Sequence, residues 1–217
     1  MADSNFWICV KNTLISAILA ALLGVVLAIG FGYLHIFKRK SVIYKIANLL
    51  NDLPIAIPHT VAGLALLLAF GRNMFGFIGN TGLAFTLFAV ILAMFFVSYP
   101  LAARNMAASV DNMDMEIVNV ARTLGDSPAK AYFRVVLPTS GVALFSSFVL
   151  ATSRSISEFA AVIMFGGNVP GKTEVLASYV FSKVEIGEFD MAVTASVFCT
   201  LISLIMVALL TLRKRFS

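Results

Sequence analysis

Long apolar stretches set the strongest limit on how this chain can fold. A helix that crosses the hydrocarbon core of a membrane needs about 20 mostly apolar residues. Of the 217 residues, 60% are hydrophobic and 12% are charged, about half the charged fraction of a soluble domain. Five stretches qualify, the second being short and interrupted by proline: Thr13–Phe37, Ile55–Phe70, Leu83–Leu101, Gly141–Phe165 and Met191–Leu212. We therefore predict an all-α integral membrane protein, a single domain over residues 1–217 with about five transmembrane helices.

The distribution of Lys and Arg predicts how this bundle is oriented. Cytoplasmic loops of membrane proteins are enriched in both residues. Eleven follow the first, third and fifth stretches: Lys38, Arg39, Lys40, Lys45, Arg104, Arg122, Lys130, Arg134, Arg213, Lys214 and Arg215. Only Lys11, Arg72, Lys172 and Lys183 lie on the other side. We expect a multi-pass protein of the cell membrane with its N-terminus outside, its C-terminus in the cytoplasm, a cytoplasmic loop at about 104–138 and an external loop at about 166–190. This asymmetry also explains the net charge of +5 without nucleic-acid binding.

The expected cytoplasmic loop contains strong helix signals. Acidic residues suit the first turns of a helix over Asp111–Leu124, and an apolar stripe recurs at helical spacing along it. Gly125 is placed to end this helix in a left-handed conformation. Ser127 and Pro128 are suited to cap and begin a second short helix, which Pro138 is expected to stop. The stripe consists of Met113, Ile117, Val120 and Leu124.

Two interpretations of this loop follow from the residues alone. In one, the amphipathic segment lies on the lipid surface. In the other, it forms a rigid apolar knob that docks in a groove of a partner and transmits a rigid-body movement.

The loop resembles the EAA loop of permeases of ATP-binding-cassette importers. The family pattern is Glu-Ala-Ala, three residues, Gly, nine residues, Ile, one residue, Leu-Pro, and Ala121, Gly125 and Leu137-Pro138 match it. Asn119 replaces the Glu, Val120 the first Ala and Val135 the Ile. The resemblance implies that an ATPase subunit binds this loop. The coupling residues are then Asn119, Val120, Ala121, Arg122, Thr123, Leu124, Gly125, Asp126, Ser127, Pro128, Leu137 and Pro138.

Further segments are similar to permeases for molybdate and tungstate: 53–63, 69–72, 154–159 and 167–174. The resemblance implies a homodimer with the pore at the subunit interface and two copies of an ATPase subunit. ATP and Mg are expected in those ATPase subunits and no cofactor in this chain. It also implies an external oxyanion-binding protein, with candidate contacts at Asn168, Pro170, Gly171, Lys172 and Glu174. Sulfate permeases share much of the pattern, so sulfate is the alternative substrate.

Arg154 and Glu158 are the charged residues inside an expected span, where each costs about 3 kcal/mol on insertion scales. Four residues apart on a helix, they can pair. With Ser155 they either line a gate for an anion or form a structural pair between helices.

Proline disturbs the start of the second stretch. Pro54 and Pro58 remove backbone donors, so freed carbonyl groups need partners or line a cavity. His59 and Thr60 follow. The segment is either part of a pore lining or a simple kink. In the external loop, residues 175–180 are either a short interfacial or re-entrant helix or an ordinary connection.

Several function classes do not fit this sequence. It has no Gly-rich phosphate loop ending in Lys-Ser or Lys-Thr, and no catalytic or metal-ligand constellation, so we expect a transport subunit and not an enzyme. An ion-coupled secondary transporter would need ionisable residues in several spans. A membrane assembly factor would not need the elbow at Gly125.

Overall fold

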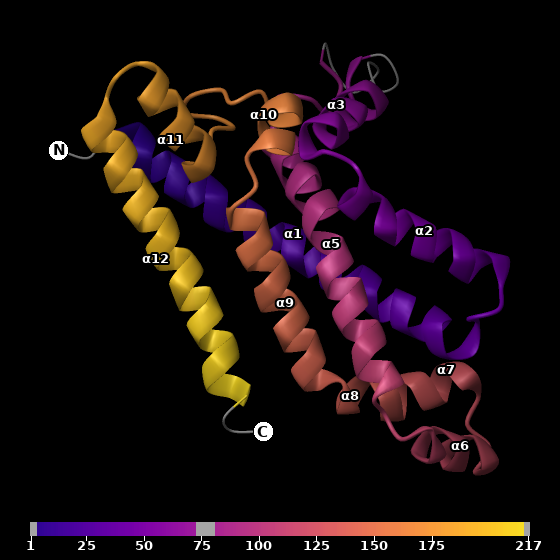
Figure 1. Ribbon diagram of the computed structural model, residues 1–217. Helices are drawn as coiled ribbons and strands as arrows, with labels where there is room; N and C mark the ends of the chain where they lie inside the picture. Colours follow the sequence, from indigo (N-terminus) through magenta and orange to yellow (C-terminus); the bar gives the residue numbers. More distant parts are fainter. Residues whose placement is uncertain (1–3, 73–80, 215–217) are drawn as a thin grey trace.

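The computed structural model describes residues 4–72 and 81–214, and the side chains of the last helix as far as Leu209; every element described is helical (Figure 1). The predicted cytoplasmic cations Arg213, Lys214 and Arg215 therefore lie outside the described side chains. The all-α architecture is as predicted.

Three of the described helices are long and apolar enough to cross a membrane. They are α1 (Ser4–Phe37), α5 (Leu87–Asp111) and α12 (Phe189–Lys214). Helix α1 packs against α5 and α9 (Gly141–Ile156), with its alanines buried at the contact. A side chain added at Gly24 would lie 3.8 Å from Tyr99 Cα. Small residues therefore let these helix backbones approach closely.

The second predicted stretch is not one helix. The chain forms α2 (Val42–Ala56) and α3 (His59–Phe70), separated at Ile57 and Pro58. Ile57 is extended, with φ −102° and ψ 146°, because the ring of a following proline disfavours the helical conformation. A helix of 12 residues such as α3 is too short to cross the hydrocarbon core alone.

The fourth predicted stretch is also broken. Helix α9 ends at Ile156, and α10 (Ala160–Gly166) begins after three intervening residues. Next to the break, Glu158 Oε1 accepts a hydrogen bond from Ala161 N at 3.0 Å, so the side chain gives a partner to a backbone N–H in the first turn of α10. The predicted interruption of the second stretch at Pro58 is therefore present, whereas the prediction of one span over Gly141–Phe165 is wrong. A fourth crossing is reached only if 128–139 and α9, bent by 70°, count as one.

The predicted external loop folds onto the N-terminal part of α1. The turn signal there is confirmed, since Asn168 and Gly171 have φ angles of 47° and 73°. Asn12 Nδ2 donates to the carbonyl groups of Lys172 and Glu174, each at 3.1 Å. Residues 176–185 form α11 (Leu176–Glu185), so the helical alternative holds for this segment.

The predicted coupling loop and the predicted external loop lie at opposite ends of the bundle. In Figure 1, α6 (Met115–Thr123) and α7 (Pro128–Ala131) lie at the end where α12 finishes, and α11 lies at the other. This separation fits two different partners, one at each end. Which end faces the cytoplasm stays a prediction.

Candidate functional site

The coupling loop is shorter than predicted. Residues 104–111 continue α5, whose last residue is Asp111. Helix α6 begins only at Met115, because Asp114 Oδ1 accepts a hydrogen bond from Glu116 N at 2.9 Å and caps it. The prediction of one helix from Asp111 to Leu124 is therefore wrong at its start. Alanine-rich sequence extends α5, and the cap at Asp114 restarts the chain in a new direction.

The elbow after α6 is confirmed. Gly125 has φ +97°, a conformation that glycine adopts without strain. Asp126 N donates to the Ala121 carbonyl at 3.1 Å, which closes the end of the helix. Ser127 Oγ then accepts from Lys130 N at 3.3 Å, and Pro128 is the first residue of α7.

Pro138 does not stop the second helix as predicted. Helix α7 continues into a π-helical turn, Tyr132–Val136, and then into α8 (Leu137–Thr139). The π turn already carries backbone hydrogen bonds to residues five positions back, and Pro138 follows it near the start of α8, where a missing N–H is tolerated. The change of direction comes at Ser140, where the chain bends by 70° into α9.

Two residues that the sequence analysis did not single out anchor this segment to the bundle. Val118 on α6 and Tyr132 are fully buried. Both belong to a cluster with Met106 and Val110 of α5. Tyr132 Oη donates to the Ile29 carbonyl of α1 at 2.6 Å. The spacing of the apolar stripe did not identify Val118, because it lies one position after Ile117, on the side of α6 that faces the bundle.

Three of the four residues of the predicted apolar stripe point away from the bundle, whereas Met113 packs against its buried cluster. Ile117, Val120 and Leu124 are 50%, 57% and 83% exposed, and Phe133 of the following π-helical turn is 59% exposed. We call these four residues the apolar knob. It is mounted on a rigid base, since the opposite side of the same segment is buried. Exposed apolar residues gathered in this way mark an interaction surface.

The predicted pore residues fall into three groups. Pro54 and Ser155 are buried in this chain, and their place in a pore lining stays a prediction. Pro58 and Thr60 are exposed at the start of α3. The remaining three, His59, Arg154 and Glu158, come together although α3 and α9 are far apart in sequence.

Glu158 is the centre of this cluster. Its side chain is 1% exposed, and its Oε2 lies 2.9 Å from Arg154 Nη2 and 3.1 Å from His59 Nδ1. Arg154 Nη2 also lies 2.9 Å from His59 Nδ1. The side chains of Arg154 and His59 are 26% and 38% exposed. The predicted Arg–Glu pair is therefore present, and His59 is a third member that the sequence placed only at a kink.

The external loop keeps four of its five predicted contacts at or near the surface. Pro170, Gly171 and Lys172 are exposed and Asn168 is partly so. Glu174 is not available there, because it is 2% exposed and its Oε2 accepts from Asn5 Nδ2 at 2.6 Å. The sequence pattern gave no sign that Asn5 would cover this carboxylate.

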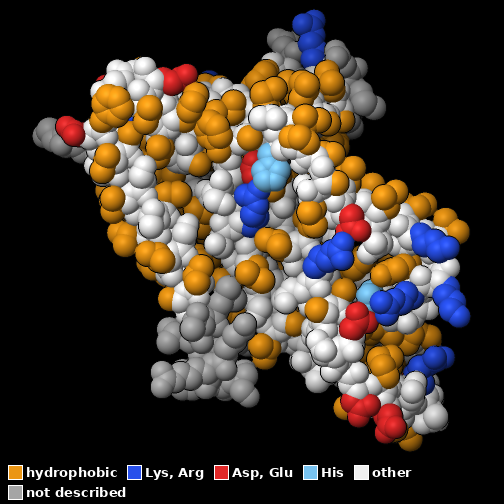
Figure 2. Space-filling model, viewed as in Figure 1, with side chains coloured by type: hydrophobic (Ala, Val, Ile, Leu, Met, Phe, Trp, Pro, Cys, Tyr) orange, Lys and Arg blue, Asp and Glu red, His pale blue; other side chains and the backbone are white. Residues whose placement is uncertain are grey.

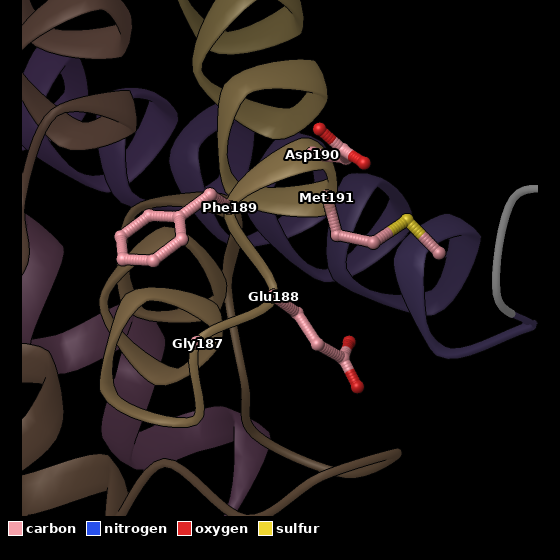
Figure 3. Close-up of a pocket in the computed structure, with 5 residues that line it drawn as sticks. All are labelled: Gly187, Glu188, Phe189, Asp190 and Met191. Atoms are coloured by element: carbon pink, nitrogen blue, oxygen red, sulfur yellow. The ribbon is translucent and has the colours of Figure 1, made fainter.

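A hollow of about 510 Å³ lies at the turn between α11 and α12, and the side chains that line it do not point toward a common centre (Figure 3). Glu188, Phe189 and Met191 point in different directions around it, and Glu188 and Asp190 would repel an anion. Within the described residues, no group of three or more His, Cys, Asp or Glu side chains is placed to hold a metal ion.

Nearly the whole chain is similar to known proteins. Residues 15–215 match the family described as binding-protein-dependent transport system inner membrane component. The probable transport system permease protein NifC of Clostridium pasteurianum is 34% identical over 180 residues, 81% of this chain and 62% of that protein. This chain thus spans less than two thirds of the NifC protein.

Two further relatives differ in the substrate that they are named for. The sulfate transport system permease protein CysT of Escherichia coli is 30% identical over 219 residues, 95% of this chain and 76% of that protein. The molybdenum transport system permease protein ModB of Haemophilus influenzae is 31% identical over 177 residues, 78% and 75% of the two. A chain of the MetNI methionine ABC transporter has the same fold, with a TM-score of 0.76 at 17% identity over 99% of this chain and 98% of that one.

Proposed function

This chain belongs to the family of binding-protein-dependent transport system inner membrane components, the permeases of ABC importers, and from that premise we propose that it carries a tetrahedral oxyanion. Molybdate or tungstate is the substrate proposed first, in line with the ModB relative. Sulfate is the second candidate, and the CysT relative favours it equally. The protein is integral to the inner membrane, and we propose that its N-terminus lies outside.

The apolar knob is the observation that carries the proposed coupling to an ATPase. Ile117, Val120 and Leu124 expose apolar side chains to water at the end of a membrane bundle, and a groove on a partner would bury them. Burial of apolar surface is the main driving force for such docking. The competing interpretation is that this segment lies on the lipid surface, and retention of the ATPase subunit by the apolar knob would distinguish the two.

The base of the knob offers a mechanical connection to the membrane. Tyr132 and Val118 pack into the ends of α1 and α5, and 128–139 leads directly into α9. Displacement of α6 by the ATPase subunit bound to it would therefore move α9 as a rigid body. Arg154 lies in the last turn of α9, and its contacts with His59 and with Glu158, which accepts from Ala161 N of α10, connect α9 to α3 and α10. Two arrangements of these elements, one open to each side, would give alternating access as a population shift.

In this proposal each partner has a separate role. ATP and Mg are held by the ATPase subunits, and an external binding protein delivers the oxyanion to the surface around Pro170, Gly171 and Lys172. Two copies of this chain form the pore between them. This chain itself binds no cofactor and catalyses no reaction.

Two measurements test the proposal. Titration of the cognate binding protein with molybdate, tungstate and sulfate identifies the substrate, and preferential binding of sulfate would replace the first candidate by the second. A pull-down of the ATPase subunit by this chain tests the coupling. Failure of the wild-type chain to retain the ATPase would reject the proposed role, whereas loss of retention only in Leu124→Asp would support the apolar knob as its binding surface.

A further inference from the structure

Three arginines lie on one face of the protein, each held by a carboxylate. Arg154 Nη2 lies 2.9 Å from Glu158 Oε2, and Arg39 Nη1 lies 3.2 Å from Asp111 Oδ1. Arg104 pairs with Asp52 on α2. The arginine side chains are 26%, 61% and 54% exposed in that order, so each keeps part of its guanidinium group open. We call Arg154, Arg104 and Arg39 the arginine row.

The row descends in regular steps toward the end of the bundle that holds α6. Arg104 precedes Asp111, the last residue of α5, by two helical turns, which places them on the same face and about 10 Å apart along the axis. Arg154 lies about 20 Å along α9 from the start of that helix at Gly141. Figure 2 shows basic, acidic and histidine side chains gathered in an oblique band on this face, between apolar side chains.

A cavity connects the lower two members of the row. It has a volume of about 360 Å³ and is lined by both Arg39 and Arg104. Tyr44 and Asn48 of α2 also line it, as does His35, whose Nδ1 lies 2.9 Å from the Tyr44 hydroxyl. Asn48 Nδ2 in turn donates to Asp52 Oδ2 at 3.2 Å. The cavity therefore offers N–H and O–H donors to an anion, beside carboxylates that oppose a tight hold.

Arg154 lies inside the fourth predicted span, where a partly exposed charge is unfavourable against lipid, whereas Arg104 and Arg39 follow the third and first predicted spans on the cytoplasmic side. We therefore expect water along this face, from Arg154 to the end of the bundle that holds α6. A bare arginine would attract a dianion strongly enough to slow its release. A neighbouring carboxylate weakens that attraction by its own charge. The Arg104–Asp52 and Arg39–Asp111 pairs are exposed and only weakly held, so their guanidinium groups can turn briefly toward a passing anion, whereas Arg154 stays beside the buried Glu158 carboxylate.

We propose that the arginine row is the oxyanion path of this permease, and that Glu158, Asp52 and Asp111 keep each contact weak enough for release. This inference rests on the proposed transport of an oxyanion. In this inference the three arginines contact the substrate. The three carboxylates increase the rate at which the substrate is released and do not bind it.

The middle pair provides the test. In the assembled transporter, Asp52→Asn leaves Arg104 unopposed, and Arg104→Gln removes the positive charge. We expect Asp52→Asn to lower the initial uptake rate of labelled oxyanion and to make the purified permease–ATPase complex retain it at least about tenfold more tightly in equilibrium dialysis. Arg104→Gln lowers uptake with no retained anion, and the double variant also retains none. Lys45→Gln, which removes an exposed cation outside the row, is the matched control and leaves both readouts unchanged.

A merely structural pair gives a different pattern. If Asp52→Asn, Arg104→Gln and the double variant all lose uptake in proportion to a fall in thermal midpoint, with no retained anion, the inference is overturned. If Asp52→Asn does not fold, Asp111→Asn makes the same test at the next pair. Absence of any oxyanion uptake by the wild-type transporter would instead reject the proposed function, so the two failures are distinguishable.

Discussion

Truncation of Leu124 to alanine should weaken ATPase binding without affecting the fold of the permease. Leu124 is 83% exposed, so the substitution removes almost no internal contact. Docking in a groove would bury its side chain, and the three carbons removed are worth about 0.8 kcal/mol each. A loss of about 2 kcal/mol corresponds to a roughly 30-fold weaker Kd.

Val118 offers a matched control on the same helix. Val118 is fully buried, so Val118→Ala leaves a cavity and should lower the free energy of unfolding by about 2 kcal/mol. The assay measures the Kd of the detergent-solubilised permease for the ATPase subunit, together with the thermal midpoint of each variant.

The reasoning about the knob predicts opposite patterns for the two variants. Leu124→Ala should change the Kd and leave the midpoint in place, whereas Val118→Ala should lower the midpoint. A Kd for Leu124→Ala within about twofold of the wild type would refute docking through this side chain, because so small a change is well below the value of its buried surface.

Three further predictions concern the fold and its orientation. Arg154→Gln should cost about 3 kcal/mol, since it leaves the buried Glu158 carboxylate without its arginine, and a larger loss of thermal stability for Glu158→Gln, which leaves only a partly exposed arginine, would contradict this reasoning. Gly63→Ala should destabilise by about 2 kcal/mol, because the new Cβ would lie 2.8 Å from Ala161 Cα, whereas Gly30→Ala, with nothing within 4 Å, should not lower the midpoint. In a background without Cys9 and Cys199, a cysteine at Asn119 should react with a membrane-impermeant reagent only from the cytoplasmic side; reaction from outside would reverse the orientation.

The all-α fold was predicted correctly from the sequence, because a long apolar segment that crosses a membrane can adopt few structures other than a helix. It failed where a helix breaks. Pro58 was visible as a kink but not as a full separation of α2 from α3. The break after Ile156 lies next to the hydrogen bond that Glu158 accepts from Ala161 N, a detail that hydrophobicity does not reveal.

The coupling loop was predicted better than the pore. Glycine at an elbow, serine at a cap and proline at a first helical position act locally, so Gly125, Ser127 and Pro128 were identified from sequence. The contribution of Tyr132 depends on the distant carbonyl of Ile29. Likewise, burial of Ser155 and Glu174 depends on packing between segments far apart in the chain.

Uptake by proteoliposomes containing this permease, its ATPase subunit and the external binding protein tests the central claim most directly. The initial rate of labelled molybdate or sulfate accumulation is measured with ATP or a non-hydrolysable analogue, with and without binding protein. The account predicts accumulation only when hydrolysable ATP and the binding protein are both present. Accumulation driven by a proton or sodium gradient without ATP would contradict it.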